Sequence, residues 1–149
     1  MTREAHHFAR RAATLLAAVV LALAGCAGLA PEPNDSEAKK FQPLADRAVI
    51  YLVRGQPLYS DRAVPVWLGD LLMITTYPDT YYRWEVPPGT HRISGHDTDF
   101  GTIAVAAEQG KVYFVEQQLS SRYDISYFTL VEELNGRAAV QRAALLKGY

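Results

Sequence analysis

Short runs of β-branched and aromatic residues, separated by turn residues, fill the chain from Arg47 onward. Runs of this length and spacing are typical of strands in an all-β domain. In the run 81–86, successive residues point to opposite faces, which places Tyr82, Trp84 and Val86 on one face. The pattern predicts an antiparallel β-sandwich of about seven or eight strands. The expected strands are 48–54, 64–68, 71–77, 81–86, 90–95, 100–105, 111–116 and 125–131.

Turn residues and the C-terminal pattern complete the predicted domain, which spans residues 47–149. Gly69 and Asp70 separate two strands and predict a hairpin with a two-residue turn. Pro65 cannot donate a hydrogen bond to a neighbouring strand, so we expect it at an edge or a bulge. Residues 137–147 are rich in alanine and leucine and predict a short C-terminal helix, with an edge strand as the alternative.

The first 25 residues have a different pattern from the rest of the chain. Three arginines near the N-terminus precede an apolar run at 12–24. A helix needs roughly 20 apolar residues to cross a membrane, and this run is shorter. A basic start, a short apolar run and small residues at its end are typical of a secretory signal peptide. Residues 1–25 are therefore predicted to be a cleaved signal peptide.

Cys26 directly follows Leu23, Ala24 and Gly25, and it is the one cysteine of the chain. This arrangement resembles a lipobox, in which the thiol accepts diacylglycerol and small residues let signal peptidase II cleave before the cysteine. We predict lipid attachment at Cys26. Two or three acyl chains hold a protein stably in a membrane, whereas one chain is marginal.

The residues that follow Cys26 predict where the domain is held. Ala27 stands where an aspartate would favour inner-membrane retention, so we expect the outer membrane, facing the periplasm, in a Gram-negative cell. Residues 26–46 contain three prolines and no sustained periodicity, which predicts a flexible tether. A flexible chain of this length spans about 25 Å root-mean-square.

Charge argues against a nucleic-acid partner. The whole chain has 15 basic and 16 acidic residues, and removing residues 1–25 takes away three basic residues and one acidic residue. The remaining chain has 12 basic and 15 acidic residues, a net charge of −3. Nucleic-acid binding rests on a basic surface, which this balance does not supply.

Four stretches of the predicted domain resemble a known bacterial lipoprotein family, domain of unknown function 2846. The likeness covers roughly residues 45–135, and its Pro-Pro-Gly-Thr-His step also resembles β-sandwiches of the PEGA type. The resemblance implies a lipid-anchored sandwich and no catalytic residues. The matching stretches are 48–54, 66–70, 86–91 and 110–115.

Histidines and acidic residues raise the question of a metal site. His91 and His96 lie near Asp97 and Asp99. Residues five apart on an extended strand point to opposite faces, so the two histidines converge only if the chain bends at Gly95. Asp97 and Asp99 also lack the distal glutamate of a calcium loop. The sequence therefore predicts a polar turn, with no metal and no cofactor.

Catalytic patterns are equally weak. Ser94 precedes Gly95, but Arg92 stands where a nucleophile elbow has glycine, and nothing else in the sequence resembles a catalytic triad. The sequence thus predicts that the protein is not an enzyme.

Aromatic residues are the remaining candidates for a binding surface. Trp67, Tyr77 and Tyr81 are predicted to form it if they lie exposed on one face. In the alternative, Tyr82 and Trp84 fill the core and Tyr81 belongs to a cross-strand pair. Three functions stay open: a lipid-anchored module that binds an envelope protein or glycan, a structural lipoprotein without a ligand, and an envelope enzyme.

Overall fold

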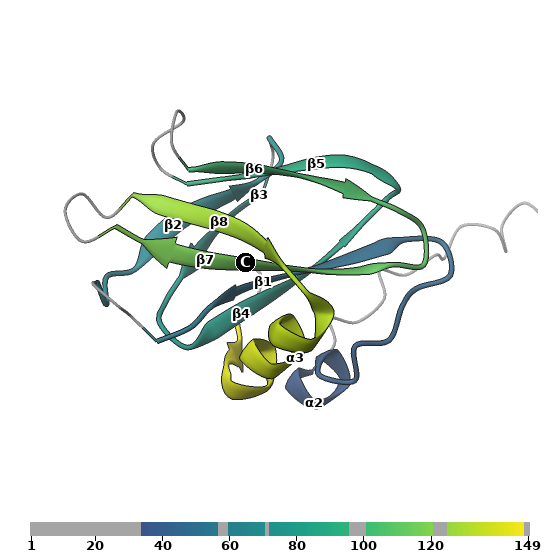
Figure 1. Ribbon diagram of the computed structural model, residues 1–149, viewed down its shortest axis with the longest axis horizontal. Helices are drawn as coiled ribbons and strands as arrows, with labels where there is room; N and C mark the ends of the chain where they lie inside the picture. Colours follow the sequence, from purple (N-terminus) through teal and green to yellow (C-terminus); the bar gives the residue numbers. More distant parts are fainter. Residues whose placement is uncertain (1–33, 57–59, 71, 96–100, 121–124, 148–149) are drawn as a thin grey trace, which may run out of the picture. The chain divides into compact units, whose positions relative to one another are not determined.

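The computed structural model describes residues 34–56, 60–70, 72–95, 101–120 and 125–147 (Figure 1). The predicted signal peptide and the lipobox residues Leu23, Ala24, Gly25 and Cys26 lie outside the described residues, as does the segment from His96 to Phe100.

In the described part of the chain nine strands form two sheets, so the predicted β-sandwich with a short C-terminal helix is confirmed. The first sheet has the strand order β8-β7-β1-β4-β9, and the second has the order β3-β2-β5-β6. The strands are β1 (Ala48–Arg54), β2 (Val64–Leu68), β3 (Leu72–Thr76), β4 (Thr80–Val86), β5 (Gly89–Ser94), β6 (Thr102–Ala107), β7 (Val112–Leu119), β8 (Ser126–Val131) and β9 (Ala144–Leu145).

Two neighbouring pairs depart from the expected antiparallel arrangement. β1 and β7 are parallel, in a register that runs from Val49 opposite Val112 to Val53 opposite Glu116. β4 and β9 are also parallel. All other strand pairs are antiparallel. A parallel pair needs a long connection rather than a tight turn, so no local sequence signal marks it.

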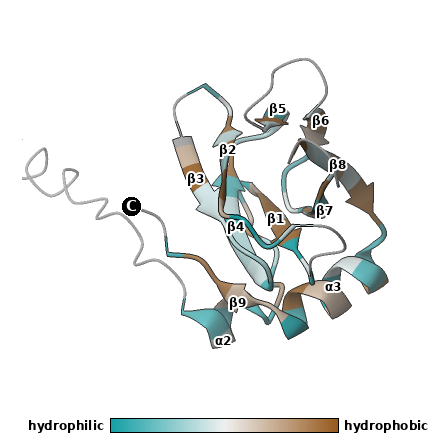
Figure 2. Ribbon diagram, turned by 90° about the vertical axis from the view of Figure 1, so that its left-hand side faces the viewer, coloured by the Kyte–Doolittle hydropathy of each residue, from teal (hydrophilic) through white to brown (hydrophobic). Residues whose placement is uncertain are grey.

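The central strand β1 is buried on both of its faces. Ile50 and Leu52 belong to the core between the two sheets. Tyr51 and Val53 belong to a second core, which lies under α2 (Asp35–Ala38) and α3 (Glu133–Arg142). Figure 2 shows α2, α3 and β9 together on one side of β1, away from the second sheet. A nearly continuous apolar run in β1 follows from this double burial.

The residues predicted to share a face of β4 do so. Val86 is buried in the core between the sheets, and Tyr82 and Trp84 pack against that core. Tyr81 points the other way and belongs to the second core.

The C-terminal helix α3 starts earlier and ends earlier than predicted, and residues 144–145 form β9 instead. Asn135 and Gly136 lie inside the helix. A Cβ atom at Gly136 would come closer than 3.0 Å to the side chain of Phe114. The glycine therefore allows close packing of α3 on β7.

The predicted flexible tether was wrong for residues 34–46. Asn34 caps α2, with its side chain accepting from the Glu37 amide at 2.9 Å. Ala38 and Phe41 are buried in the second core. This segment is part of the folded domain because its apolar side chains are covered by α3 and the first sheet.

The predicted hairpin joins β2 to β3. Gly69 adopts a positive φ of 66°, which favours glycine. Leu68 pairs with Leu72, so the connection is one residue longer than expected. Pro65 pairs with Thr75 of β3, in the part of β2 that β5 does not pair with, so its missing donor costs no hydrogen bond there.

Candidate functional site

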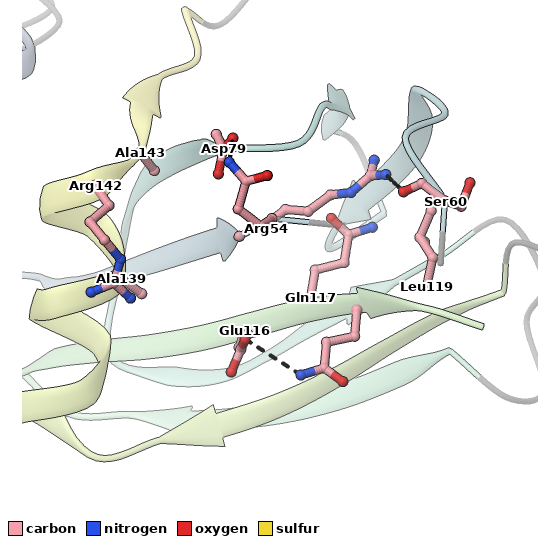
Figure 3. Close-up of a pocket in the computed structure, with 12 residues that line it drawn as sticks. Arg54, Ser60, Asp79, Glu116, Gln117, Leu119, Ala139, Arg142 and Ala143 are labelled. Carbon is pink, nitrogen blue, oxygen red and sulfur yellow. Dashed lines mark hydrogen bonds between the residues drawn. The ribbon is translucent and has the colours of Figure 1, made fainter. Parts of the chain in front are cut away.

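A pocket of about 430 Å³ lies where β7 extends beyond the end of β1. The last registered pair of these two strands is Val53 and Glu116, and β7 continues to Leu119. Figure 3 shows β1 and β7 contributing side chains to one part of the pocket, with α3 contributing Ala139 and Arg142 to another. The lining residues are Arg54, Gly55, Gln56, Ser60, Asp79, Glu116, Gln117, Gln118, Leu119, Ala139, Arg142 and Ala143.

Arg54 is the most deeply buried charge of this lining, with 3% of its surface exposed. It follows Ile50 and Leu52 at the same alternate spacing and so points between the two sheets. Its guanidinium donates to the carbonyl oxygens of Arg62 at 2.6 Å, Ser60 at 2.9 Å and Thr76 at 3.2 Å. These bonds compensate the burial of the charge and fix the chain that follows β1.

Gln117 lies beside Arg54 in the lining, with 1% of its surface exposed. Its Nε2 donates to Ser126 Oγ at 2.9 Å. Its Oε1 has no hydrogen-bond partner among the described residues. An unpaired buried acceptor typically costs about 1–3 kcal/mol, so such a group requires an explanation.

Most of the remaining described residues of the lining are polar or charged, and Leu119, Ala139 and Ala143 add apolar surface. Gln56 Nε2 donates to Asp79 Oδ2, and Gln118 Nε2 donates to Glu116 Oε1 at 3.5 Å. Arg142 is exposed at the C-terminal end of α3. Among the described residues, two arginines and two carboxylates border the pocket, together with three amide side chains.

This composition suits the binding of a polar, neutral or zwitterionic group. Amide side chains both donate and accept hydrogen bonds, and the carboxylates and arginines add stronger acceptors and donors. The volume falls within the range of roughly 300–1,000 Å³ of small-molecule pockets. None of the described residues in the lining is a histidine or a cysteine, and Ser60 accepts a hydrogen bond from Arg54 through its carbonyl oxygen.

The predicted aromatic surface does not form. Trp67 is half-buried on β2 and alternates with the core residues Val66 and Leu68, so it points away from the core between the sheets. Tyr77 is exposed beyond the end of β3.

Tyr81 cannot belong to an exposed surface because none of its surface is exposed. Its hydroxyl donates to Asp35 Oδ1 of α2 at 3.0 Å. Burial, and next the hydrogen bond to Asp35, raise the pKa of Tyr81 above its ordinary value. The face that Tyr81 occupies is covered by α2, which the sequence placed in the tether.

His91 is held by contacts within the domain. Its Nε2 lies 2.7 Å from the carbonyl oxygen of Pro87, and its ring packs edge-on against Trp84. Within the described ranges no group of three or more metal-ligating side chains comes together. His96, Asp97 and Asp99 lie outside those ranges.

Sequence reasoning missed Arg54 and Gln117, although both carry a recognisable signal. Arg54 stands at a core-facing position of the strand that begins at Ala48. Gln117 has the same alternate spacing after Tyr113 and Val115 in β7. A polar residue at a core-facing position of a strand indicates a buried polar site.

Comparison with known proteins adds no family. The chain matches no protein-family model, and it is not significantly similar to any curated protein. Among the residues that the structure describes, no helix is both long enough and apolar enough to cross a membrane.

Proposed function

We propose that this protein is a bacterial envelope lipoprotein whose β-sandwich binds a polar envelope component in the pocket beside Arg54 and Gln117. The predicted lipid on Cys26 holds the protein at a membrane, and the resemblance to the domain of unknown function 2846 family agrees with that position. The observation that carries the binding role is the pocket itself, with a deeply buried arginine and an amide oxygen that has no partner among the described residues.

The pocket favours a binding module over a purely structural lipoprotein. A domain that serves only as a structural element gains nothing from an unpaired buried acceptor, because that acceptor costs stability. A ligand that donates a hydrogen bond to Gln117 Oε1 would supply the partner that this acceptor lacks among the described residues. Hydroxyl and amide groups of a glycan or peptide have the donors and acceptors that this lining complements.

The lipid anchor is tested by metabolic labelling with a fatty acid. Wild-type protein is expected to carry the label and to fractionate with membranes, whereas Cys26→Ser loses the label and is not processed. A Cys26→Ser variant that labels and fractionates like wild type would show that the lipobox interpretation is wrong.

Binding is tested by amide chemical shifts of the isotope-labelled protein, with soluble disaccharide-peptide fragments of peptidoglycan as the probe. We expect shifts at Gly55, Gln56 and Gln117 and weaker binding by Arg142→Ala. Arg92→Ala is the matched control, since Arg92 is exposed on β5 of the other sheet. Shifts that are absent, or confined to β5 and β6, would contradict the pocket as the binding site.

A further inference from the structure

The segment of residues 34–44 packs against the domain as a strap. Tyr51 donates its hydroxyl to the carbonyl oxygen of Ala38 at 2.5 Å. The ring of Phe41 lies 5.3 Å from the ring of Tyr51 and 5.7 Å from that of Phe114. Arg137 of α3 covers Phe41, with its Cζ atom 4.9 Å from the ring centroid. Only 4% of Phe41 is exposed, so the strap is held by the core rather than by surface contacts.

Phe41 reaches this position in an unfavourable backbone conformation. Its φ is +54°, in the left-handed region that non-glycine residues avoid. Such a conformation persists only where the surrounding contacts hold it. The buried ring supplies those contacts, which indicates that the strap is firmly held.

A second set of bonds fastens the strap to the end of α3. Lys39 Nζ donates to the carbonyl oxygen of Ala143 at 2.7 Å, and Gln141 Nε2 donates to that of Lys39 at 3.2 Å. The amide of Leu145 donates to Asp35 Oδ1 at 3.2 Å. Ala143 also lines the pocket, so the strap is bonded to one wall of the candidate site.

We propose that the strap shortens the connection between lipid and domain, so that the pocket can serve only partners at the membrane surface. This inference rests on the proposed lipid attachment at Cys26. Eight peptide units separate Cys26 from Asn34. We call the connection between Cys26 and Asn34 the leash. An extended chain advances at most about 3.3–3.6 Å per residue, so the leash reaches no more than about 29 Å.

The expected 26–46 tether would have given the domain far more freedom. A chain of that length reaches about 70 Å when extended. In flexible form, the root-mean-square span is about 16 Å for eight residues and about 25 Å for twenty. The binding partner is therefore an envelope component that lies next to the membrane carrying the lipid.

Energy transfer between the domain and a membrane tests the leash. Because Cys26 is acylated, Ala138→Cys on the exposed face of α3 supplies a free thiol for a donor dye. The lipidated full-length protein is reconstituted in vesicles of phosphatidylethanolamine and phosphatidylglycerol that carry a headgroup-labelled acceptor lipid. The three proteins compared are the Ala138→Cys parent, the parent with about thirteen Gly/Ser residues inserted after Gly28 to restore the longer reach, and the parent with Phe41→Asp.

We expect strong transfer in the parent and weaker transfer in both the insertion and the Phe41→Asp variant. Leu134→Ala, a change at an exposed position of α3, is the control and should keep the transfer of the parent. Unchanged transfer after the insertion would overturn the proposal, because the leash would then not set the distance. Unchanged transfer in Phe41→Asp would also overturn it, because the strap would then not shorten the connection.

Two readouts separate this inference from the proposed function. Mass spectrometry of the protein shows whether Cys26 carries acyl chains, and a protein without them overturns the lipid attachment and the leash together. Hydrogen exchange reports the strap alone, in the absence of vesicles. The amides of Ala38, Lys39 and Phe41 donate to carbonyl oxygens at 2.9–3.2 Å and should exchange slowly. Exchange at the rate of an unstructured chain would overturn the docked strap even if Cys26 is acylated.

Discussion

Gly136 of α3 lies against the ring of Phe114 in β7, with no room for a side chain between them. A Cβ atom at residue 136 would approach the Phe114 side chain more closely than real Cβ atoms approach any neighbour. Glycine normally weakens a helix interior by about 1 kcal/mol relative to alanine. In α3 this cost is offset by the close packing of the helix on the first sheet.

Gly136→Ala is therefore expected to destabilise the domain, although alanine is the better helix former. Overpacking of a well-filled core typically costs about 1–3 kcal/mol. Chemical unfolding monitored by circular dichroism measures the change. Asn135→Ala, at an exposed neighbouring position of the same helix, should change the unfolding free energy by no more than about 0.5 kcal/mol. Equal effects of the two variants would contradict the packing argument.

Substitutions at Phe41 separate the contribution of its ring from that of its backbone strain. Phe41→Ala removes a buried ring and should destabilise the domain by about 3–5 kcal/mol. Phe41→Gly should be no less stable than Phe41→Ala, because glycine adopts the positive φ without penalty. Thermal or chemical unfolding of the two variants tests the order. A glycine variant clearly less stable than the alanine variant would contradict the strained backbone.

Arg54→Met tests whether the buried arginine organises the chain around the pocket. The substitution leaves three carbonyl oxygens without their donor, at Ser60, Arg62 and Thr76. Hydrogen bonds to a charged group contribute about 1.5–3 kcal/mol each, and their loss is partly regained by water, so we expect a loss of about 2–4 kcal/mol. Arg92→Met, at an exposed arginine, should stay within about 0.5 kcal/mol of wild type. If Arg54→Met leaves the unfolding free energy unchanged, the buried arginine does not have this role.

Asp35 gives the strap a pH dependence. Partial burial raises the pKa of its carboxyl, but hydrogen bonds from Lys39, Tyr81 and the Leu145 amide outweigh that effect and hold the pKa below its ordinary value. The unfolded state then binds more protons, so the stabilisation by Asp35 is present above about pH 4 and is lost as the pH falls through the folded pKa.

The difference in unfolding free energy between wild type and Asp35→Asn should accordingly shrink below about pH 4. Its size at neutral pH should stay under about 1 kcal/mol, because half of the Asp35 side chain is exposed to solvent. Tyr81→Phe removes one donor to the carboxylate and should weaken the pH dependence. An NMR titration that places the Asp35 pKa above its ordinary value would contradict this account.

A double substitution separates the stability of the domain from its binding. Gln117→Met with Ser126→Ala removes both partners of a buried hydrogen bond and also the unpaired oxygen of Gln117. Replacing both partners by apolar groups of similar shape is close to neutral. We expect the unfolding free energy of the double variant to lie within about 1 kcal/mol of the wild-type value. We also expect the double variant to lose binding of the peptidoglycan fragments. Intact binding by the double variant would show that Gln117 does not contact the ligand.

Much of the local structure could be predicted from neighbouring residues. β1 was predicted with its observed bounds because its apolar run ends sharply at Gly55. The faces of Tyr82 and Trp84 followed from the alternation of a strand. The hairpin at Gly69 was predicted from the two turn residues between two strand runs, although its connection is one residue longer than expected. In each case the signal lies within a few residues of the feature that it predicts.

The candidate site was not predictable in the same way. Arg54 and Gln117 lie 63 positions apart in the chain and meet because β1 and β7 pair in parallel. No local sequence pattern in either strand predicts that the two strands pair. The need for glycine at residue 136 was not predictable for the same reason, since the Phe114 ring that excludes a side chain there belongs to a distant strand.

The sequence by itself determined the approximate positions of β1 to β8, the alternating faces of β4 and the lipobox prediction at Cys26, because periodicity and short motifs depend on adjacent residues. Only the tertiary structure decided that residues 34–46 belong to the domain, that Tyr81 is covered, and that a pocket opens beyond the end of β1. The physical reason is that burial depends on which distant segments pack together. From the local sequence, an apolar residue such as Phe41 in a proline-containing stretch is predicted to belong to a tether. Only the packing of distant segments shows that its ring is buried in a core.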